Sequence, residues 1–167
     1  MRMVSVHSLA LDQTIDVGRR IGQYSQNNSG PSVIFVGGVH GNEPSGIFAL
    51  QRVLARLEKA DIDFSGSLHA LSGNLHALQH KERYTDYDLN RIWFDLSANG
   101  KGEKAKNALE KTERNELVIE FDQIIKSNDG PFFVFDLHTT SSYSVPFLVL
   151  GDTLRNREIV HDIPAPV

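Results

Sequence analysis

The fold is decided by the stretch VIFVGGVHGNEPSG, residues 33–46. Its first four residues are β-branched or aromatic, which predicts a strand buried on both faces. Glycines then permit a tight loop, and Pro44 stands where the first turn of a helix tolerates proline. The following IFALQRVLARLEKA places apolar residues at helical spacing. The stretch therefore predicts a strand, a loop and a helix in succession.

The rest of the chain repeats this alternation. Residues 66–71 fit a second strand, and FFVFDLH, residues 132–138, predicts another strand that is buried on both faces. Between them, residues 103–127 have the apolar stripe of a long amphipathic helix, whose charged residues we expect to lie in solvent. Apolar strands that alternate with helices indicate an α/β protein with a helix-covered, largely parallel sheet.

The outer segments extend the pattern. Residues 1–30 open with short alternating pieces typical of edge strands, and LSANGKG, residues 96–102, predicts a flexible turn. Near the other end, residues 146–152 (PFLVLGD) resemble a strand and residues 153–162 a short helix. A chain of 167 residues suffices for one ordinary domain and not for two. We therefore expect a single domain, residues 1–167.

Composition narrows the classes of function. The net charge of −4 offers no basic surface for nucleic acid. The longest apolar runs, VIFV and FFVF, are too short to span a membrane, and the first residues lack the apolar core of a secretory signal. Because the chain has no cysteine, a metal site must use His, Asp and Glu. We expect a cytoplasmic protein without a nucleic-acid or membrane partner.

Two predicted strands end in a histidine. His40 and Glu43 follow the first in the motif HGNE, and His138 follows a later one in the motif DLH. Ligands bind at the carboxyl ends of such strands, and two His plus one Glu are an established zinc set. A lone His-x-x-Glu is a weak signal, and His138 would also fit a hydrogen-bonded core histidine. The combination predicts one zinc ion held by His40, Glu43 and His138.

The segment RYTDYDLNRIW, residues 83–93, is either a solvated charged loop or part of the same site. Arginine holds carboxylates through two parallel hydrogen bonds, and Asn90 can donate to the same ligand. Asp88 can accept the free ring N–H of a zinc-bound histidine and fix its tautomer. Beside a zinc ion, the segment would bind a small carboxylate.

The motifs HGNE, RYxDxDLNR and DLHTT, in this order, resemble the succinylglutamate desuccinylase/aspartoacylase family of the zinc carboxypeptidase clan. The resemblance extends roughly from Val33 to Thr140. It implies a three-layer α/β/α sandwich with a mostly parallel mixed sheet. It also implies a single zinc carboxypeptidase-like domain with the strand-rich opening segment 1–30.

The resemblance further implies a reaction and a role for each site residue. Asn90 and Arg91 would hold the substrate carboxylate, and Arg83 would polarise the scissile carbonyl and its oxyanion. Asp88 would orient a zinc-bound histidine. The implied activity removes an acyl group from an N-acyl amino acid or a similar small carboxylate, with zinc-activated water attacking the amide carbonyl.

The chain departs from the family at the general base. The resemblance implies a general-base glutamate well downstream of the third zinc ligand, followed by a smaller β-rich domain. Only 29 residues follow His138, and their one glutamate, Glu158, falls on an exposed helix face in the predicted pattern. We therefore expect a C-terminally truncated chain that binds zinc but hydrolyses amides poorly or not at all.

Other functions remain open. A carboxypeptidase acting on peptides would share the zinc ligands and the Asn-Arg clamp, and a non-catalytic module would hold metal and carboxylate without turnover. The loop HTTSSYS, residues 138–144, suggests a serine nucleophile, but no glycine-flanked nucleophile turn precedes it. His76 and His80, four residues apart, could chelate a metal on a helix, although a partly exposed turn suits them better.

Overall fold

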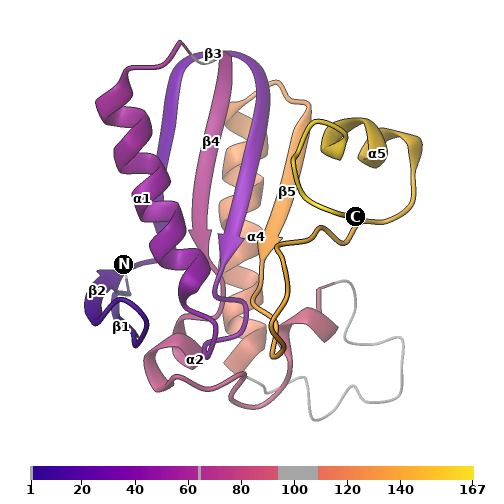
Figure 1. Ribbon diagram of the computed structural model, residues 1–167. Coiled ribbons are helices and arrows are strands. Elements are labelled where there is room, and N and C mark those ends of the chain that lie inside the picture. The colour runs from indigo at the N-terminus through magenta and orange to yellow at the C-terminus, as the bar shows by residue number, and fades with distance from the viewer. Residues whose placement is uncertain (1, 64, 94–108) are drawn as a thin grey trace.

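The computed structural model describes residues 2–63, 65–93 and 109–167 (Figure 1). Its strands are β1 (Val4–Ser8), β2 (Gln13–Val17), β3 (Arg20–Gly37), β4 (Ser65–Ser72) and β5 (Phe132–Leu137). Its helices are α1 (Ser45–Ala60), α2 (Leu75–His80), the 3₁₀ turn η1 (Leu89–Arg91), α4 (Leu109–Ser127) and α5 (Leu154–Val160). None of these helices combines the length and the apolar character needed to cross a bilayer.

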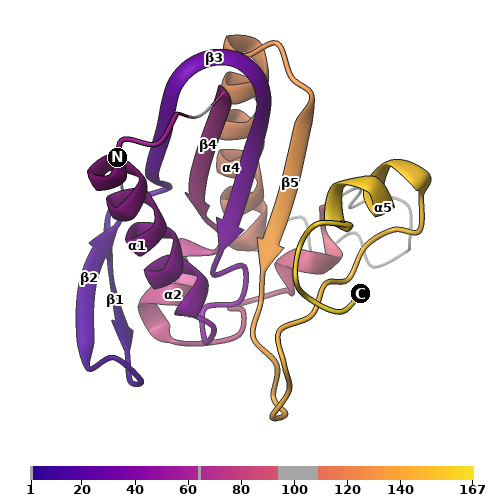
Figure 2. The ribbon, with the colours of Figure 1, turned by 45° about the horizontal axis from the view of Figure 1, so that its top comes forward.

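The main sheet is built around β3, with the order β4-β3-β5. Residues 32–37 of β3 pair parallel with β4 on one side and with β5 on the other. The earlier part of β3 arches over the start of β4 (Figure 2). There, residues 20–27 pair with β4 in the opposite sense, since Arg20 lies opposite Leu71 and later residues of β3 lie opposite earlier ones of β4. The sheet is therefore mixed and mostly parallel, as predicted.

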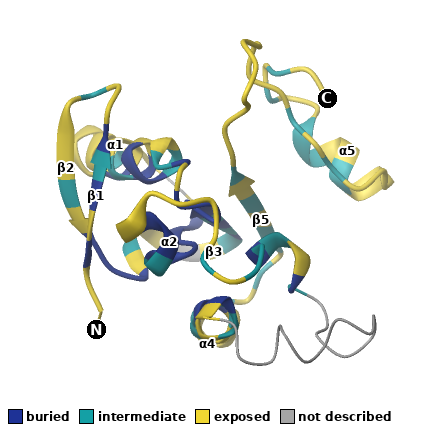
Figure 3. Ribbon diagram, turned by 90° about the horizontal axis from the view of Figure 1, so that it is seen from below, coloured by how far each residue is buried: buried dark blue, intermediate teal, exposed yellow. Residues whose placement is uncertain are grey.

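Helices cover both faces of this sheet. Figure 3 shows α1 and α4 on opposite sides, with the buried residues gathered between them. The core on the α1 side contains Tyr24, Leu50, Leu54, Leu68 and Ala70. The core on the α4 side contains Ile34, Val36, Val39, Leu71, Leu89, Ile92, Leu117 and Ile124. Each fully buried aliphatic side chain contributes about 1.5–3 kcal/mol, so these two layers stabilise the predicted three-layer α/β/α sandwich.

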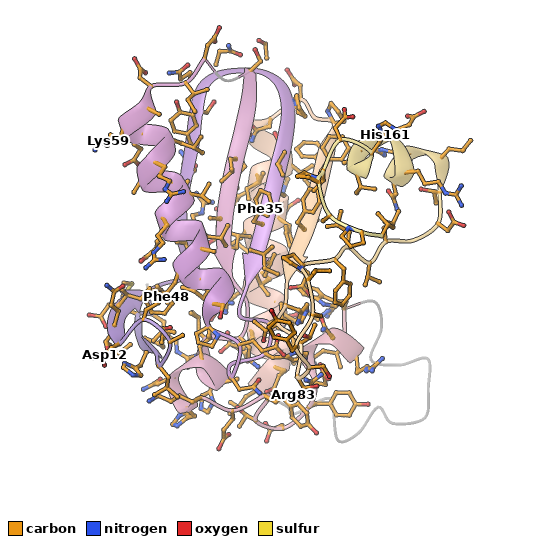
Figure 4. The ribbon with its side chains drawn as sticks, in the orientation of Figure 1. Asp12, Phe35, Phe48, Lys59, Arg83 and His161 are labelled. Atoms are coloured by element: carbon orange, nitrogen blue, oxygen red, sulfur yellow. The ribbon has the colours of Figure 1, made fainter. Side chains whose placement is uncertain are left out.

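The first residues form a small accessory unit. β1 and β2 pair as an antiparallel hairpin, which confirms short strands within residues 1–30. Val4, Val6 and Val17 pack against α1 and α2, where Phe48 of α1 and Leu78 of α2 belong to the same apolar cluster. Figure 4 shows Phe48 on the side of α1 that faces this hairpin. The hairpin thus fixes the position of α2 beneath the sheet.

The last part of the chain differs from the prediction in two respects. β5 is not buried on both faces: Val134 is 59% exposed, because β5 has β3 on one side and an open cavity of about 940 Å³ between it and residues 144–160. Residues 146–152 form no strand and pair with none of the described strands, whereas α5 confirms the predicted short helix. The predicted turn at residues 96–102 lies outside the described residues.

α4 also departs from the prediction, which placed its charged residues in solvent. Glu110 and Glu113 are 0% and 1% exposed. Glu113 pairs with the buried Arg19, and its carboxylate also accepts the N–H groups of Leu75 and His76 at the start of α2. These partners come from segments far away in the chain, so the helical pattern of α4 alone does not reveal them.

The pair between Arg19 and Glu113 gives a stability test. We expect Glu113→Ala to lower the free energy of unfolding by about 3–5 kcal/mol, because it leaves a buried guanidinium without its main partner. Glu116 also contacts Arg19, at 2.7 Å, but its side chain is 40% exposed. Glu116→Ala is therefore the matched control and should cost less than about 1 kcal/mol. Urea unfolding measures both values, and equal losses in the two variants would contradict the assignment.

Candidate metal and carboxylate site

The predicted ligands meet at the carboxyl ends of β3 and β5, the lower edge of the sheet in Figure 1. His40 and Glu43 lie in the loop between β3 and α1, and His138 directly follows β5. One ligand atom from each residue lies within 4.8 Å of the other two. Among the described residues, this is the one cluster of three such side chains, so the pair His76 and His80 does not extend to a metal site.

Glycine allows the ligand loop to press against α2. At Gly41, a Cβ would lie 2.0 Å from the carbonyl carbon of Ala77, so any side chain would collide with the helix backbone. Gly38 has a φ of +70°, a conformation that favours glycine. The Glu43 N–H then donates to the His40 carbonyl at 3.1 Å, which closes the turn between the two ligands.

Both histidines face Glu43 through the same ring nitrogen. His40 Nδ1 lies 2.9 Å from Glu43 Oε1, and His138 Nδ1 lies 3.3 Å from Glu43 Oε2. The ring centroids are 4.8 Å apart. Two imidazole nitrogens and a carboxylate that converge in this way form a donor set that suits a zinc ion. The residues therefore fit the metal that the motifs imply.

Carboxylates hold the opposite ring nitrogens. Asp88 Oδ1 lies 3.2 Å from His40 Nε2, and Asp136 Oδ2 lies 2.6 Å from His138 Nε2. Such partners keep the proton on Nε2 and leave the Nδ1 lone pair for a metal. Asp88 thus lies beside one histidine of the predicted ligand set. Asp136 was not predicted, although its spacing of two from His138 puts both on one face of an extended segment.

The loop before and within η1 carries the predicted carboxylate clamp. Arg83 Nη1 lies 3.8 Å from Glu43 Oε1, and Figure 4 shows Arg83 below the carboxyl ends of the strands. Asn90 Nδ2 lies 3.3 Å from His138 Nε2. Arg91 is exposed, and the described residues provide no ion-pair partner for its guanidinium. Arg83 and Asn90 thus contact the metal cluster, and Arg91 follows Asn90 in η1; both arginines are accessible to a ligand.

The hydrogen bond to Asp136 raises the pKa of His138. Burial acts in the opposite direction, but the negative charges of Asp136 and Glu43 add to the effect of the hydrogen bond. In the metal-free protein, His138 therefore stays protonated to a higher pH than an ordinary histidine.

The carboxylates of the site have lowered pKa values. Burial by itself would raise the pKa of Glu43, but hydrogen bonds from the Thr139 N–H and from His40 bring it below the usual value. Burial opposes ionisation of Asp88 as well, and hydrogen bonds from His40 and the Asn90 N–H again outweigh it. The site therefore holds ionised carboxylates, which attract a cation.

These shifts predict how the stability of the metal-free protein depends on pH. The contribution of His138 is complete below its ordinary pKa of 6.5 and is lost as the pH rises through the raised pKa. The contributions of Glu43 and Asp88 are present above 4.5 and 3.8 and are lost as the pH falls through their lowered values. Melting temperatures in a chelator buffer should therefore decline towards alkaline pH.

The variant His138→Gln should remove this alkaline decline, whereas His161→Gln, at an exposed position, should retain it. The same decline in His138→Gln as in the unmodified chain would show that another group causes it.

Comparison with known proteins identifies the family. The model described as "Succinylglutamate desuccinylase/Aspartoacylase catalytic domain" matches residues 29–158, more than half of the chain. The chain is 29% identical over 83 residues to a succinylglutamate desuccinylase of Pseudomonas paraeruginosa, which is 50% of this chain and 25% of that protein. It is 26% identical over 123 residues to a probable aspartoacylase of Acaryochloris marina, which is 72% of this chain and 39% of that protein.

Solved structures give the same result. The succinylglutamate desuccinylase of Chromobacterium violaceum matches with a TM-score of 0.53 and 26% identity, over 65% of this chain and 33% of that one. The enzyme of Vibrio cholerae shares the fold at a TM-score of 0.56 and 16% identity, over 83% of this chain and 40% of that one. The chain thus spans about a quarter to two fifths of the length of these relatives. The resemblance predicted from the motifs is confirmed, and the chain belongs to the succinylglutamate desuccinylase/aspartoacylase catalytic-domain family.

Proposed function

We propose that this chain is the metal- and substrate-binding part of a zinc-dependent hydrolase that removes the acyl group from an N-acyl amino acid. The observation that carries the proposal is the convergence of His40 Nδ1, His138 Nδ1 and the Glu43 carboxylate beside the loop of Arg83. The family match and the names of the relatives, succinylglutamate desuccinylase and probable aspartoacylase, support it.

Each residue of the cluster has a role in holding the metal. His40, Glu43 and His138 would bind one zinc ion, which would supply a Lewis acid for the carbonyl and lower the pKa of a water molecule. Asp88 and Asp136 hold the Nε2 protons and so present both Nδ1 atoms to the ion. The ligand set is therefore oriented before the metal arrives.

The accessible arginines would bind and polarise the substrate. Arg83, next to Glu43, can donate to the oxygen that becomes negative when the amide carbonyl is attacked. Asn90 and Arg91 would hold the carboxylate of the amino acid, since a guanidinium matches a carboxylate with two parallel hydrogen bonds. The substrate would thus be fixed at both ends.

The general base is the part of the site that the described residues do not supply. Glu43 contacts both histidines, while Asp88 and Asp136 each hold one ring N–H. Glu158 lies exposed on α5, as the sequence predicted. We therefore propose that the chain alone binds zinc and a carboxylate ligand but turns substrate over slowly or not at all.

Zinc affinity tests the ligand set. His138→Ala should weaken zinc binding by at least about 100-fold, because it removes one of three protein ligands. His161→Ala, at an exposed position directly after α5, is the control and should bind zinc like the unmodified chain. Competition with a coloured chelator measures both affinities, and unchanged binding by His138→Ala would refute the three-ligand site.

Activity of the purified, zinc-loaded chain tests the missing base. We expect release of free amino acid from N-acetylaspartate and N-succinylglutamate to stay close to that of the metal-free chain. Calorimetry should nevertheless detect binding of these compounds, and Arg91→Ala should weaken it by about 10-fold or more. The control is Arg52→Ala on the exposed side of α1. Rapid zinc-dependent release by the unmodified chain would show that a base is present.

A further inference from the structure

Glu110 is a buried carboxylate, and three of its four hydrogen-bond partners are backbone N–H groups of residues 85–87, in the loop between Arg83 and Asp88. Its Oε1 accepts from the backbone N–H of Thr85 at 2.6 Å and from Asn74 Nδ2 at 3.1 Å. Its Oε2 accepts from the N–H groups of Asp86 and Tyr87, each at 3.1 Å. Among the described residues, no lysine or arginine pairs with Glu110. Its negative charge is therefore stabilised by four hydrogen bonds, three of them from consecutive peptide groups.

The residues of the proposed carboxylate clamp lie on both sides of the three residues that Glu110 holds. Residues 85–87 lie between Arg83 and Asp88, and η1 with Asn90 and Arg91 follows. When three consecutive N–H groups point at one carboxylate, the orientation of their peptide planes is fixed. The direction in which the flanking side chains leave the loop is fixed with them.

Asp86 binds back to the same helix. Its Oδ2 accepts the N–H of Leu109, the first residue of α4, at 2.8 Å. Glu110 thus holds the backbone of Asp86 while Asp86 holds the start of the helix, a reciprocal arrangement like that of a capping box. The loop and the first turn of α4 therefore form one unit.

The burial of a carboxylate at this position has a free-energy cost that its role in the structure must explain. Moving a carboxylate out of water costs several kcal/mol unless hydrogen bonds replace the water, and an apolar residue would complete the stripe of α4 without that cost. Three of the four hydrogen bonds of Glu110 come from the one loop that presents Arg83 to Glu43 and Asn90 to His138, and the fourth comes from Asn74. The location of its partners points to the site rather than to the core.

We propose that Glu110 is a positioning residue for the carboxylate clamp, which it orients by holding the backbone of residues 85–87. The inference rests on the proposed function, because the clamp is defined there. The metal ligands lie on other segments, after β3 and after β5. Loss of Glu110 should therefore affect the binding of a carboxylate far more than the binding of zinc.

Glu113 provides the matched control, since it lies one turn further along α4 and is equally buried. Its carboxylate binds Arg19 and the N–H groups at the start of α2, and none of its hydrogen bonds goes to residues 85–87. Glu110→Gln and Glu113→Gln therefore make the same chemical change at two buried sites of one helix. In both, an amide NH₂ replaces an oxygen that accepted N–H groups.

The first measurement is amide hydrogen exchange of the metal-free chain by NMR, which does not depend on the proposed function. Glu110→Gln should lower the protection of Thr85, Asp86 and Tyr87 by about 10-fold or more, and Glu113→Gln should leave it near that of the unmodified chain. Unchanged protection in Glu110→Gln would overturn the proposal.

The second measurement is calorimetric binding of N-acetylglutamate to the zinc-loaded chain, together with zinc affinity. Glu110→Gln should weaken carboxylate binding by about 10-fold and leave zinc affinity within about 3-fold. Glu113→Gln should change neither beyond about 3-fold. Equal losses of zinc and carboxylate binding in Glu110→Gln would show a general structural role and overturn the proposal.

Two further outcomes are decisive. If Glu110→Gln does not fold, Asp86→Ala, at an exposed position, tests the same unit of loop and helix. This variant should bind the carboxylate more weakly than the unmodified chain and bind zinc with the same affinity. Carboxylate binding equal to that of the unmodified chain would overturn the proposal. If the unmodified chain binds zinc but no carboxylate, the proposed function fails and the clamp role fails with it. In that case, the exchange measurement still shows whether Glu110 holds the loop.

Discussion

The parallel pairing of β3 with β5 brings together two segments that are 95 residues apart in the chain. Because both strands run in the same direction, the loops that follow them leave the sheet at the same edge. Each loop begins with a histidine-containing motif, so the pairing alone carries His138 to the side of Glu43.

Three sets of carboxylates position the side chains at this edge of the sheet. Glu43 lies between the two histidines, Asp88 and Asp136 hold the far sides of their rings, and Glu110 holds the loop that supplies Asp88. Glu43, His40 and Glu110 are buried, and these hydrogen bonds replace the water that their polar groups lose. The polar groups of the site are therefore positioned by other polar groups.

The sequence predicts those parts of the molecule that depend on local pattern. Apolar runs predict the inner strands, and glycines predict the tight loop after β3. Motif order predicts that His40, Glu43 and His138 form one group. The local pattern does not predict the burial of Glu110 and Glu113, because their partners lie on segments that only the fold brings near α4. The exposure of β5 is not predicted for a related reason: an apolar run such as FFVF occurs both in central strands and in edge strands of a sheet. A strand at residues 146–152 was wrongly predicted because composition indicates a preference for strand but not the presence of a neighbouring strand.

The arch of β3 has a consequence for sequence variation. Since one continuous strand pairs with β4 in both directions, β4 is enclosed, and seven of its eight residues are buried. Two of its polar residues are also hydrogen-bonded: Ser67 bonds to Ser32 and contacts His69. A substitution in β4 must therefore fit its volume and its hydrogen bonds at once, whereas the half-exposed β5 has room on its outer face. Drift during evolution should leave β4 nearly unchanged and alter the exposed Val134 of β5 more readily, although both strands belong to the same sheet.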